Sequence, residues 1–185
     1  MSKKIVFEGK IFQVVQENLK HKDHIIALEY VTRAPGVRVI VVKDDKILLN
    51  EEIRHHPEGL DYRLPGGKVF DLLSEFKQAL DDGADMKKAA EAAGVREVEE
   101  ETGMIVSDLQ YLHTNHGGAT VRTDIFYFST TNLEEGDQKL EPGEEIKPVW
   151  KNFEEVKELC FNGGIKEDMT VAVLFRFLDG IMKKK

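Results

Sequence analysis

Residues 96–104 read REVEEETGM, and their spacing places three carboxylates together. In a helix with about 3.6 residues per turn, Glu97, Glu100 and Glu101 stand at i, i+3 and i+4 on one face. Carboxylates stacked in this way repel one another, and nothing in helix propensity favours the arrangement. A hard divalent cation removes the conflict, because magnesium and manganese prefer oxygen ligands and leave positions for water and phosphate. The spacing therefore predicts a helix whose acidic face binds Mg²⁺ or Mn²⁺.

The plainer alternative is an acidic helix face that is simply solvated, which is the usual meaning of a glutamate cluster. The residues around the cluster favour the metal site. Arg96 opens the run, Val98 and Met104 hold apolar positions, and Gly103 suits the end of a helix. Glu99 points away from the shared face and is expected to be solvated.

Working outward from this helix, the remaining pattern predicts a mixed α/β domain with strands before and after it. The apolar run Val37–Val42 is typical of a central strand that is buried on both faces. Two β-rich stretches, 5–15 and 25–32, flank a polar turn and predict an N-terminal hairpin. Further strands are expected at 46–53, 62–64, 106–113, 120–130 and 146–151. Helices are expected at 72–80, 85–102, 153–159 and 167–178.

Composition limits the class of partner. A chain of 185 residues with 41% apolar residues is sized for one compact domain. A formal charge of -8 argues against binding to nucleic acid or a membrane surface, since both are negatively charged. No apolar run is long enough to cross a bilayer. The lone Cys160 cannot form an internal disulfide and the opening residues lack an export signal, so a cytoplasmic location is expected.

The run at 96–104 resembles the second half of the Nudix box, Arg-Glu-apolar-x-Glu-Glu-x-Gly-apolar, at every specified position. The resemblance identifies the chain as a member of the Nudix hydrolase superfamily. It implies an α/β Nudix fold, in which a mixed sheet lies between helices, and metal-dependent cleavage of a diphosphate bond. The first half of the box departs from the pattern. Gly67 lies 29 positions before Arg96, which is 15 more than in the family, and Lys88 occupies the position of the family's first glutamate.

Much of the rest of the chain is similar to the branch that contains ADP-ribose and nucleoside-diphosphate-sugar diphosphatases. This resemblance implies an N-terminal hairpin region at 1–34 that forms a homodimer, followed by a Nudix hydrolase domain at 35–185. It also implies a set of substrate-binding residues: Arg54, Arg33, Phe12 and Leu64. The alternatives are a core position for the phenylalanine and solvated side chains for the arginines.

The acidic loop at 141–146 resembles the loop that gives this branch a further metal ligand and a general base. Glu144 aligns with the ligand, and Glu141 lies close to the base; the alternative is an ordinary acidic loop. The implied metal ligands are Glu97, Glu101, Glu100, Glu144 and the backbone carbonyl of Gly66. The implied catalytic residues are Glu101, Glu100, Glu144, Glu141 and Arg96, the last of which orients the glutamates.

The function expected from these residues is magnesium-dependent hydrolysis of a nucleoside diphosphate sugar to a nucleoside monophosphate and a sugar phosphate. Two alternatives remain. One is a diphosphatase for nucleoside triphosphates or dinucleoside polyphosphates, and the other is a non-catalytic sensor of nucleotide sugars. Relatives specialised for ADP-ribose carry a Ser-x-Glu element where this chain has Ala119-Thr120-Val121-Arg122. The base and the sugar therefore stay open.

Overall fold

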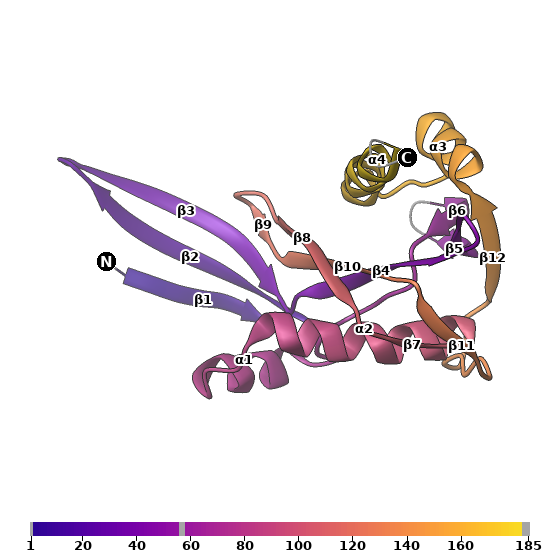
Figure 1. The fold of residues 1–185 in the computed structure, drawn as a ribbon. Helices are drawn as coiled ribbons and strands as arrows, with labels where there is room; N and C mark the ends of the chain where they lie inside the picture. The colour runs from indigo at the N-terminus through magenta and orange to yellow at the C-terminus, as the bar shows by residue number, and fades with distance from the viewer. Residues whose placement is uncertain (1, 56–57, 183–185) are drawn as a thin grey trace.

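The computed structural model describes residues 2–55 and 58–182, and Figure 1 shows a mixed α/β molecule with a projecting N-terminal arm. The strands of the first half are β1 (Ser2–Glu8), β2 (Phe12–His21), β3 (His24–Arg33), β4 (Gly36–Lys43), β5 (Lys46–His55) and β6 (Glu58–Arg63). Those of the second half are β7 (Met104–Ser107), β8 (Gln110–His116), β9 (Val121–Arg122), β10 (Asp124–Thr130), β11 (Asn132–Glu135) and β12 (Ile146–Asn152). The helices are α1 (Leu73–Asp81), α2 (Met86–Thr102), α3 (Phe153–Asn162) and α4 (Asp168–Met182).

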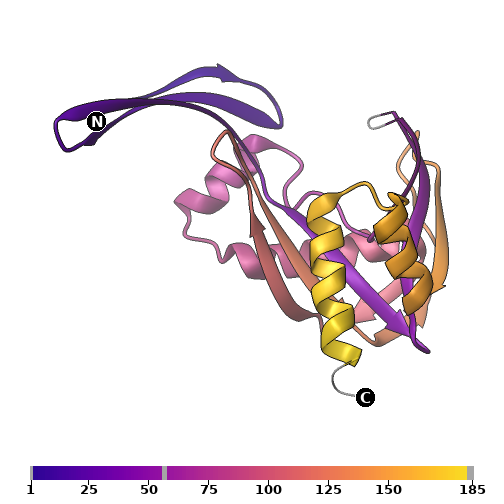
Figure 2. The same ribbon diagram turned by 90° about the horizontal axis from the view of Figure 1, so that it is seen from above.

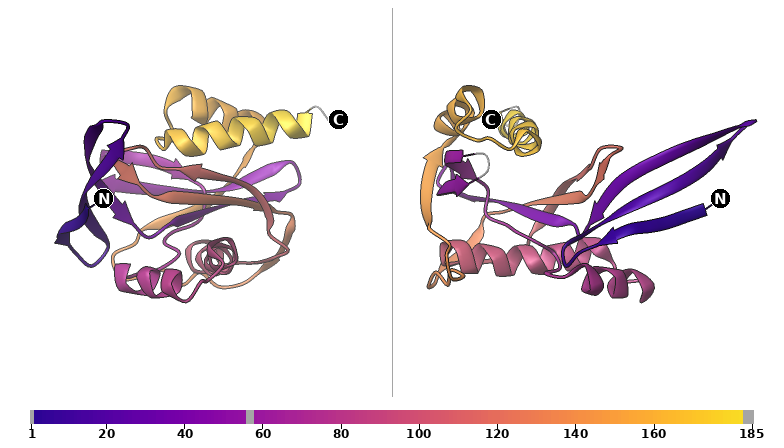
Figure 3. Two further views of the ribbon diagram at one scale, coloured as in Figure 1. Left: turned by 90° about the vertical axis from the view of Figure 1, so that its left-hand side faces the viewer. Right: turned by 180° about the vertical axis from the view of Figure 1, so that it is seen from behind.

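The central six-stranded sheet has the order β12-β5-β4-β10-β8, with β6 paired to β5. β4 and β10 pair in parallel, whereas the other neighbours pair antiparallel. Helix α2 covers one face of the sheet, while α3 and α4 cover the other (Figure 3). The predicted fold class, a mixed sheet between helices, is confirmed.

The central strand β4 divides its side chains between the two layers. Val37, Val39 and Val41 belong to the buried cluster beneath α2, while Ile40 belongs to the cluster beneath α3 and α4. This alternation follows from the two-residue period of a strand. The prediction of a strand buried on both faces is confirmed. Arg38 is the charged exception and points toward the side of α4.

The N-terminal arm differs from the predicted hairpin. The stretch 5–15 is not one strand, because the chain turns between β1 and β2, where Gly9 N–H donates to the Phe12 carbonyl at 2.9 Å. β1, β2 and β3 consequently form an antiparallel sheet, to which β9 adds in parallel. The sheet extends away from the body of the molecule in Figure 2. Its apolar residues therefore gain little burial from the central core.

Three more differences concern strands. The predicted strand 106–113 is divided into β7, which pairs with β11, and β8, which joins the central sheet. The predicted strand 120–130 is divided into β9, which joins the N-terminal sheet, and β10, which joins the central one. The short strand β11 was not predicted, because its sequence, Asn-Leu-Glu-Glu, is too polar to show a strand pattern. It pairs with β7 in a separate two-stranded sheet.

Helix α2 carries the residues of the expected site, and both of its ends are defined locally. Asp85 accepts hydrogen bonds from the N–H groups of Lys87 and Lys88, as an N-cap residue does. Gly103 ends the helix in a left-handed conformation, with φ of 72°. The buried Gly94 lets α2 approach β4 closely, since a Cβ there would lie 3.0 Å from a Val39 methyl group. In residues 2–55 and 58–182, no helix is long and apolar enough to cross a membrane.

Candidate functional site

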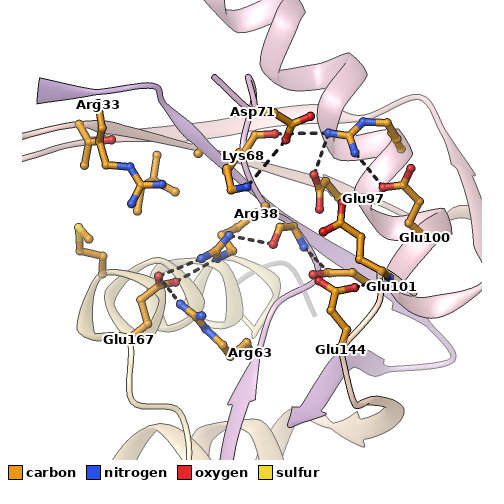
Figure 4. Close-up of a pocket in the computed structure, with 18 of the residues that line it drawn as sticks. Arg33, Arg38, Arg63, Lys68, Asp71, Glu97, Glu100, Glu101, Glu144 and Glu167 are labelled. Atoms are coloured by element: carbon orange, nitrogen blue, oxygen red, sulfur yellow. Dashed lines mark hydrogen bonds and ion pairs between the residues drawn. The ribbon is translucent and has the colours of Figure 1, made fainter. Parts of the chain in front are cut away.

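A cleft with a volume of about 480 Å³ lies where the ends of β3 and β4, the loop before α1, helix α2 and the start of α4 come together (Figure 4). The charged residues that line it are Arg33, Arg38, Arg54, Arg63, Lys68, Asp71, Arg96, Glu97, Glu100, Glu101, Glu141, Glu144 and Glu167. Most of the predicted site residues therefore share one cavity, although they come from distant parts of the chain.

The guanidinium of Arg96 holds two of the helix carboxylates. It donates to Glu97 Oε1 and to Glu100 Oε2, each at 2.8 Å. The two bonds reduce the repulsion between carboxylates one turn apart. Burial raises the pKa of Glu97, and the charge of Arg96 opposes that rise.

Glu101 is the most deeply placed carboxylate of the helix. Its Oε2 accepts a hydrogen bond from Gly66 N–H at 2.8 Å and another from Asn50 Nδ2 at 2.9 Å. Burial nevertheless raises the pKa of Glu101 to about 7, and the nearby charge of Glu97 adds to the rise. The positive charge that the protein places near Glu101 is therefore too small to offset the cost of burying its ionised carboxylate.

The loop before α1 lies directly against these carboxylates. A Cβ on Gly67 would lie 2.3 Å from Glu97 Oε2, so a side chain there would displace the end of Glu97. Gly66 has φ of 142°, in the region that favours glycine, and a Cβ there would lie 2.2 Å from the Val37 carbonyl oxygen. Gly66 is thus required for the close packing of this loop against β4.

On the other side of the cleft, Glu167 binds two arginines. It accepts bonds from Arg38 Nε at 3.2 Å, Arg38 Nη2 at 3.1 Å and Arg63 Nη2 at 2.8 Å, and a further bond from the Thr170 hydroxyl. Burial alone would raise the pKa of Glu167, but Arg38, Thr170 and Arg63 lower it to about 2. Arg38 Nη1 also donates to the carbonyls of Val37 and Gly66, at 2.9 and 3.0 Å. Figure 4 shows the two guanidiniums meeting at Glu167.

The acidic loop follows a segment that is bonded to the end of α2, where Lys139 N–H donates to the Glu100 carbonyl at 2.8 Å. Glu144 Oε2 accepts from Glu141 N–H at 2.9 Å, and Glu144 N–H donates to the Glu141 carbonyl at 3.1 Å. Both residues line the cleft, and Glu144 also faces Glu101 across an adjoining cavity of about 60 Å³. Both side chains are exposed to solvent.

Of the four residues expected to bind substrate, two line the cleft and two do not. Arg33 and Arg54 line the cleft, and Arg54 pairs with Glu52 at 3.3 Å. Leu64 is 1% exposed and packs in the core beneath α3 and α4, with one side toward the small cavity. Phe12 lies on the N-terminal sheet, where its ring contacts that of Phe7 at 5.5 Å between centroids.

Two residues outside the expected site have defined places. Glu99, expected to be solvated, forms an ion pair with Lys139 at 2.7 Å. Lys88 is exposed on the first turn of α2, so no carboxylate supports the helix from the position of the family's first glutamate.

The carboxylates suit a hard cation in chemistry, although they are not clustered around one point. In the described part of the chain, no three Asp, Glu, His or Cys side chains converge closely enough to hold a metal ion. Glu97 and Glu100 are bound to Arg96 instead, while Glu101 is bound to Gly66 and Asn50. The donor set consists of oxygens, and buried Glu101 would be stabilised by an added positive charge. The chemistry of these donors therefore suits a divalent cation.

Sequence analysis missed six residues: Arg38, Arg63, Lys68, Asp71 and Glu167, which line the cleft, and Asn50, which lines the small adjoining cavity. Arg38 and Asn50 interrupt apolar strands, and a polar residue in a strand buried on both faces is itself a signal. Glu167 gives no such signal, because it lies before α4 among other polar residues and 129 positions after Arg38.

Comparison with known proteins bears on the family and the fold. A family model described as "NUDIX domain" matches residues 32–169. A solved structure described as the crystal structure of ADP compounds hydrolase superposes with a TM-score of 0.74. It shares 17% sequence identity, and the match covers 100% of this chain and 94% of that one. A search of curated proteins returned no match. At 17% identity the structural likeness concerns the fold.

The buried position of Glu101 leads to a prediction about stability. The folded-state pKa of about 7 lies above the ordinary value of 4.5, so the folded protein holds this proton more tightly than the unfolded chain. The free energy of unfolding should therefore fall as the pH rises from about 4.5 to about 7, by about 3 kcal/mol from this group. Glu101→Gln removes the charge and keeps an oxygen for Gly66 and Asn50. In chelator at pH 8 this variant should resist urea better than the wild type.

The matched control is Glu99→Gln, on the same helix but outside the cleft. Urea titrations at pH 5 and pH 8 measure both variants. A Glu101→Gln protein that is less stable than the wild type at pH 8, with metal removed, would contradict the assignment of an uncompensated carboxylate.

Proposed function

Since this chain belongs to the Nudix hydrolase family, we propose that it hydrolyses the diphosphate bond of a nucleoside diphosphate sugar in a magnesium-dependent reaction. The observation that carries the proposal is the division of charge across one cleft. Glu97, Glu100 and Glu101 line the side formed by α2, while Arg33 and Arg54 line other parts of the same cavity. A diphosphate needs both surfaces, because its oxygens bind cations directly and also accept bonds from guanidinium groups.

The proposed metal ligands are Glu97, Glu100, Glu101 and Glu144, with the Gly66 carbonyl beside them. A bound Mg²⁺ supplies charge neutralisation for the phosphate oxygens and orients them for displacement. Arg96 positions Glu97 and Glu100 through its two bonds of 2.8 Å. Gly66 N–H and Asn50 direct Glu101 toward the same cavity.

In the proposed reaction, a water oxygen forms a bond to one phosphorus as the bond from that phosphorus to the bridging oxygen breaks. The water loses a proton to a carboxylate of the site, and the departing phosphate carries the electron pair of the broken bond. Glu141 is the proposed acceptor of that proton. It lines the cleft, and no side-chain hydrogen bond ties it in the described structure. The products are a nucleoside monophosphate and a sugar phosphate.

The proposed substrate class draws support from two sources. The solved structure whose chain is matched over 94% of its length is described as an ADP compounds hydrolase. The cleft also holds free space for more than a diphosphate, at about 480 Å³. A diphosphatase for triphosphates or dinucleotides is the second catalytic candidate, and a nucleotide-sugar sensor is the non-catalytic one.

A substrate panel separates these three functions. The purified protein is incubated with ADP-ribose, ADP-glucose, GDP-mannose, UDP-glucose, dTDP-glucose, nucleoside triphosphates and a dinucleoside polyphosphate, with magnesium or with chelator. We expect release of nucleoside monophosphate from diphosphate sugars only, and only with magnesium. Cleavage restricted to triphosphates or dinucleotides would favour the second candidate, and binding without cleavage would favour the sensor.

A second prediction concerns the carboxylate that the proposal needs most. Glu101→Gln should lower magnesium-dependent kcat by on the order of a hundredfold, because it removes a charged metal ligand without removing its hydrogen-bond acceptor. Glu99→Gln changes the same residue type two positions away, outside the cleft, and should keep wild-type turnover. Near-normal activity of the Glu101 variant, with circular dichroism showing both proteins folded, would refute the assignment.

We also propose that residues 1–34 form the homodimer contact and that residues 35–185 form the hydrolase domain. The N-terminal sheet leaves large apolar side chains exposed, among them Phe7 at 51%, Ile25 at 74% and Ile26 at 43%. Exposed apolar side chains gathered on one element mark protein contacts. Sedimentation velocity should show a dimer for the wild type and a shift toward monomer for Ile25→Lys. A wild-type monomer at micromolar concentration would exclude the contact.

A further inference from the structure

The carbonyl of Gly66 is already bound to a guanidinium. The neighbouring carbonyls of Pro65 and Gly67 each accept a hydrogen bond from a backbone N–H of β4, at 2.9 and 3.0 Å. The Gly66 carbonyl, which lies between them, accepts instead from Nη1 of the Arg38 side chain, at 3.0 Å (Figure 4). The resemblance of this loop to its Nudix counterpart implies that the same oxygen binds a metal ion. In this chain the oxygen meets a fixed cation.

Arg38 is held in place by three groups. Its Nη1 also donates to the Val37 carbonyl at 2.9 Å, and its Nε and Nη2 donate to the two oxygens of Glu167 at 3.2 and 3.1 Å. The side chain is 12% exposed. A guanidinium bound along both edges of its planar fork cannot turn away without breaking several bonds, and it does not lose its proton in a protein. The positive charge beside Gly66 is therefore permanent.

The charge of Arg38 is only partly offset by its carboxylate partner. Glu167 is shared with Arg63, whose Nη2 donates to it at 2.8 Å. Arg63 also lies 3.7 Å from Asp61 and 3.9 Å from Glu52. Among the described residues, Glu167 is the one carboxylate within ion-pair distance of Arg38. The side of Arg38 that faces the loop therefore keeps part of its positive charge.

This charge acts on Glu101 as well as on Gly66. Arg38, Gly66 and Glu101 all line both the cleft and the small adjoining cavity. Burial raises the pKa of Glu101 to about 7, and the charge of Arg38 is among the influences that oppose the rise. The guanidinium thus does two things that a bound cation would do at this corner of the cleft. It binds the carbonyl oxygen, and it stabilises the ionised carboxylate.

We propose that the Arg38 guanidinium takes the place of a divalent cation at the Gly66 carbonyl, so that the α2 carboxylates and Glu144 hold a single exchangeable metal ion. The inference rests on the proposed magnesium-dependent hydrolysis. A carbonyl oxygen has a second lone pair, but a divalent cation bound there would lie beside a permanent like charge. Repulsion between like charges is strong in a poorly solvated corner, where the effective dielectric constant is low. The built-in cation therefore excludes a mobile one from this oxygen.

The test counts the Mn²⁺ ions that the full chain binds without substrate, by titration calorimetry and by electron paramagnetic resonance of free Mn²⁺. The wild type should bind one ion. Arg38→Met keeps the length of the side chain and removes its charge and its donors. This variant should bind a second ion, and it should bind the first about tenfold more tightly, because a positive charge has left the cleft. Arg38→Lys keeps the charge and should keep a single ion.

Arg63→Met is the matched control, because Arg63 shares Glu167 with Arg38 but forms no hydrogen bond to the Gly66 carbonyl in the described part of the chain. It should keep a single ion. Misfolding weakens metal binding, so a gain of an ion by Arg38→Met cannot result from it. A wild-type count other than one, an unchanged count in Arg38→Met, or an equal gain in Arg63→Met would overturn the proposal.

Anomalous scattering from crystals grown with Mn²⁺ gives a direct check. An ion bonded to the Gly66 oxygen should appear in the Arg38→Met protein, and such an ion in the wild type would contradict the inference. The two proposals fail separately. A second ion gained by Arg38→Met, without hydrolysis of any compound in the substrate panel, rejects the enzymatic function alone. Magnesium-dependent hydrolysis by a protein whose ion count does not respond to Arg38 rejects this inference alone.

Discussion

The hydrogen bond from Gly66 N–H to Glu101, 2.8 Å long, is the contact on which the arrangement of the cleft depends. It joins the carboxylate helix α2 to the loop that leaves β6. The other side of the same residue, the Gly66 carbonyl, is held by Arg38, which is held in turn by Glu167 at the start of α4. One glycine therefore connects the helix layers on opposite faces of the sheet. A displacement of the loop would disturb both the acidic and the basic side of the cleft.

The buried carboxylates on the two sides of the cleft are stabilised to different extents. Glu167 is fully compensated, since two guanidiniums and a hydroxyl surround it and its pKa is held at about 2. Glu101 is only partly compensated, and its pKa rises to about 7. A compensated pair gives a rigid wall, whereas an uncompensated carboxylate has free energy to gain from a cation. The difference supports the proposal that the cation binds on the α2 side, with the Arg38–Glu167 pair as a rigid support.

Local patterns explain why much of this arrangement was predictable. The i, i+3, i+4 spacing located the acidic face, and the N-cap and C-cap residues of α2 located its ends. The Val37–Val42 run located the central strand. The Arg38–Glu167 contact was not predictable, because it joins residues 129 positions apart and neither sequence neighbourhood indicates the other. The division of 5–15 into two strands was missed for a local reason, because a glycine such as Gly9 in a strand-like stretch is compatible with a bulge as well as with a turn.

The long segment before α2 shows how an insertion can become an ordered part of the fold. A flexible loop of this length would lose conformational entropy if it were ordered by a ligand alone. Here the segment is ordered in advance, because Glu75 accepts a hydrogen bond from Leu72 N–H at the start of α1, and the helix is tied to the arm by Lys77 and the Leu73 N–H group. Its apolar side consequently faces a cavity whose other walls come from the arm and from the sheet. The arm and the insertion are therefore joined at two points, the Lys10 carbonyl and the Glu8 carboxylate, and together they line that space.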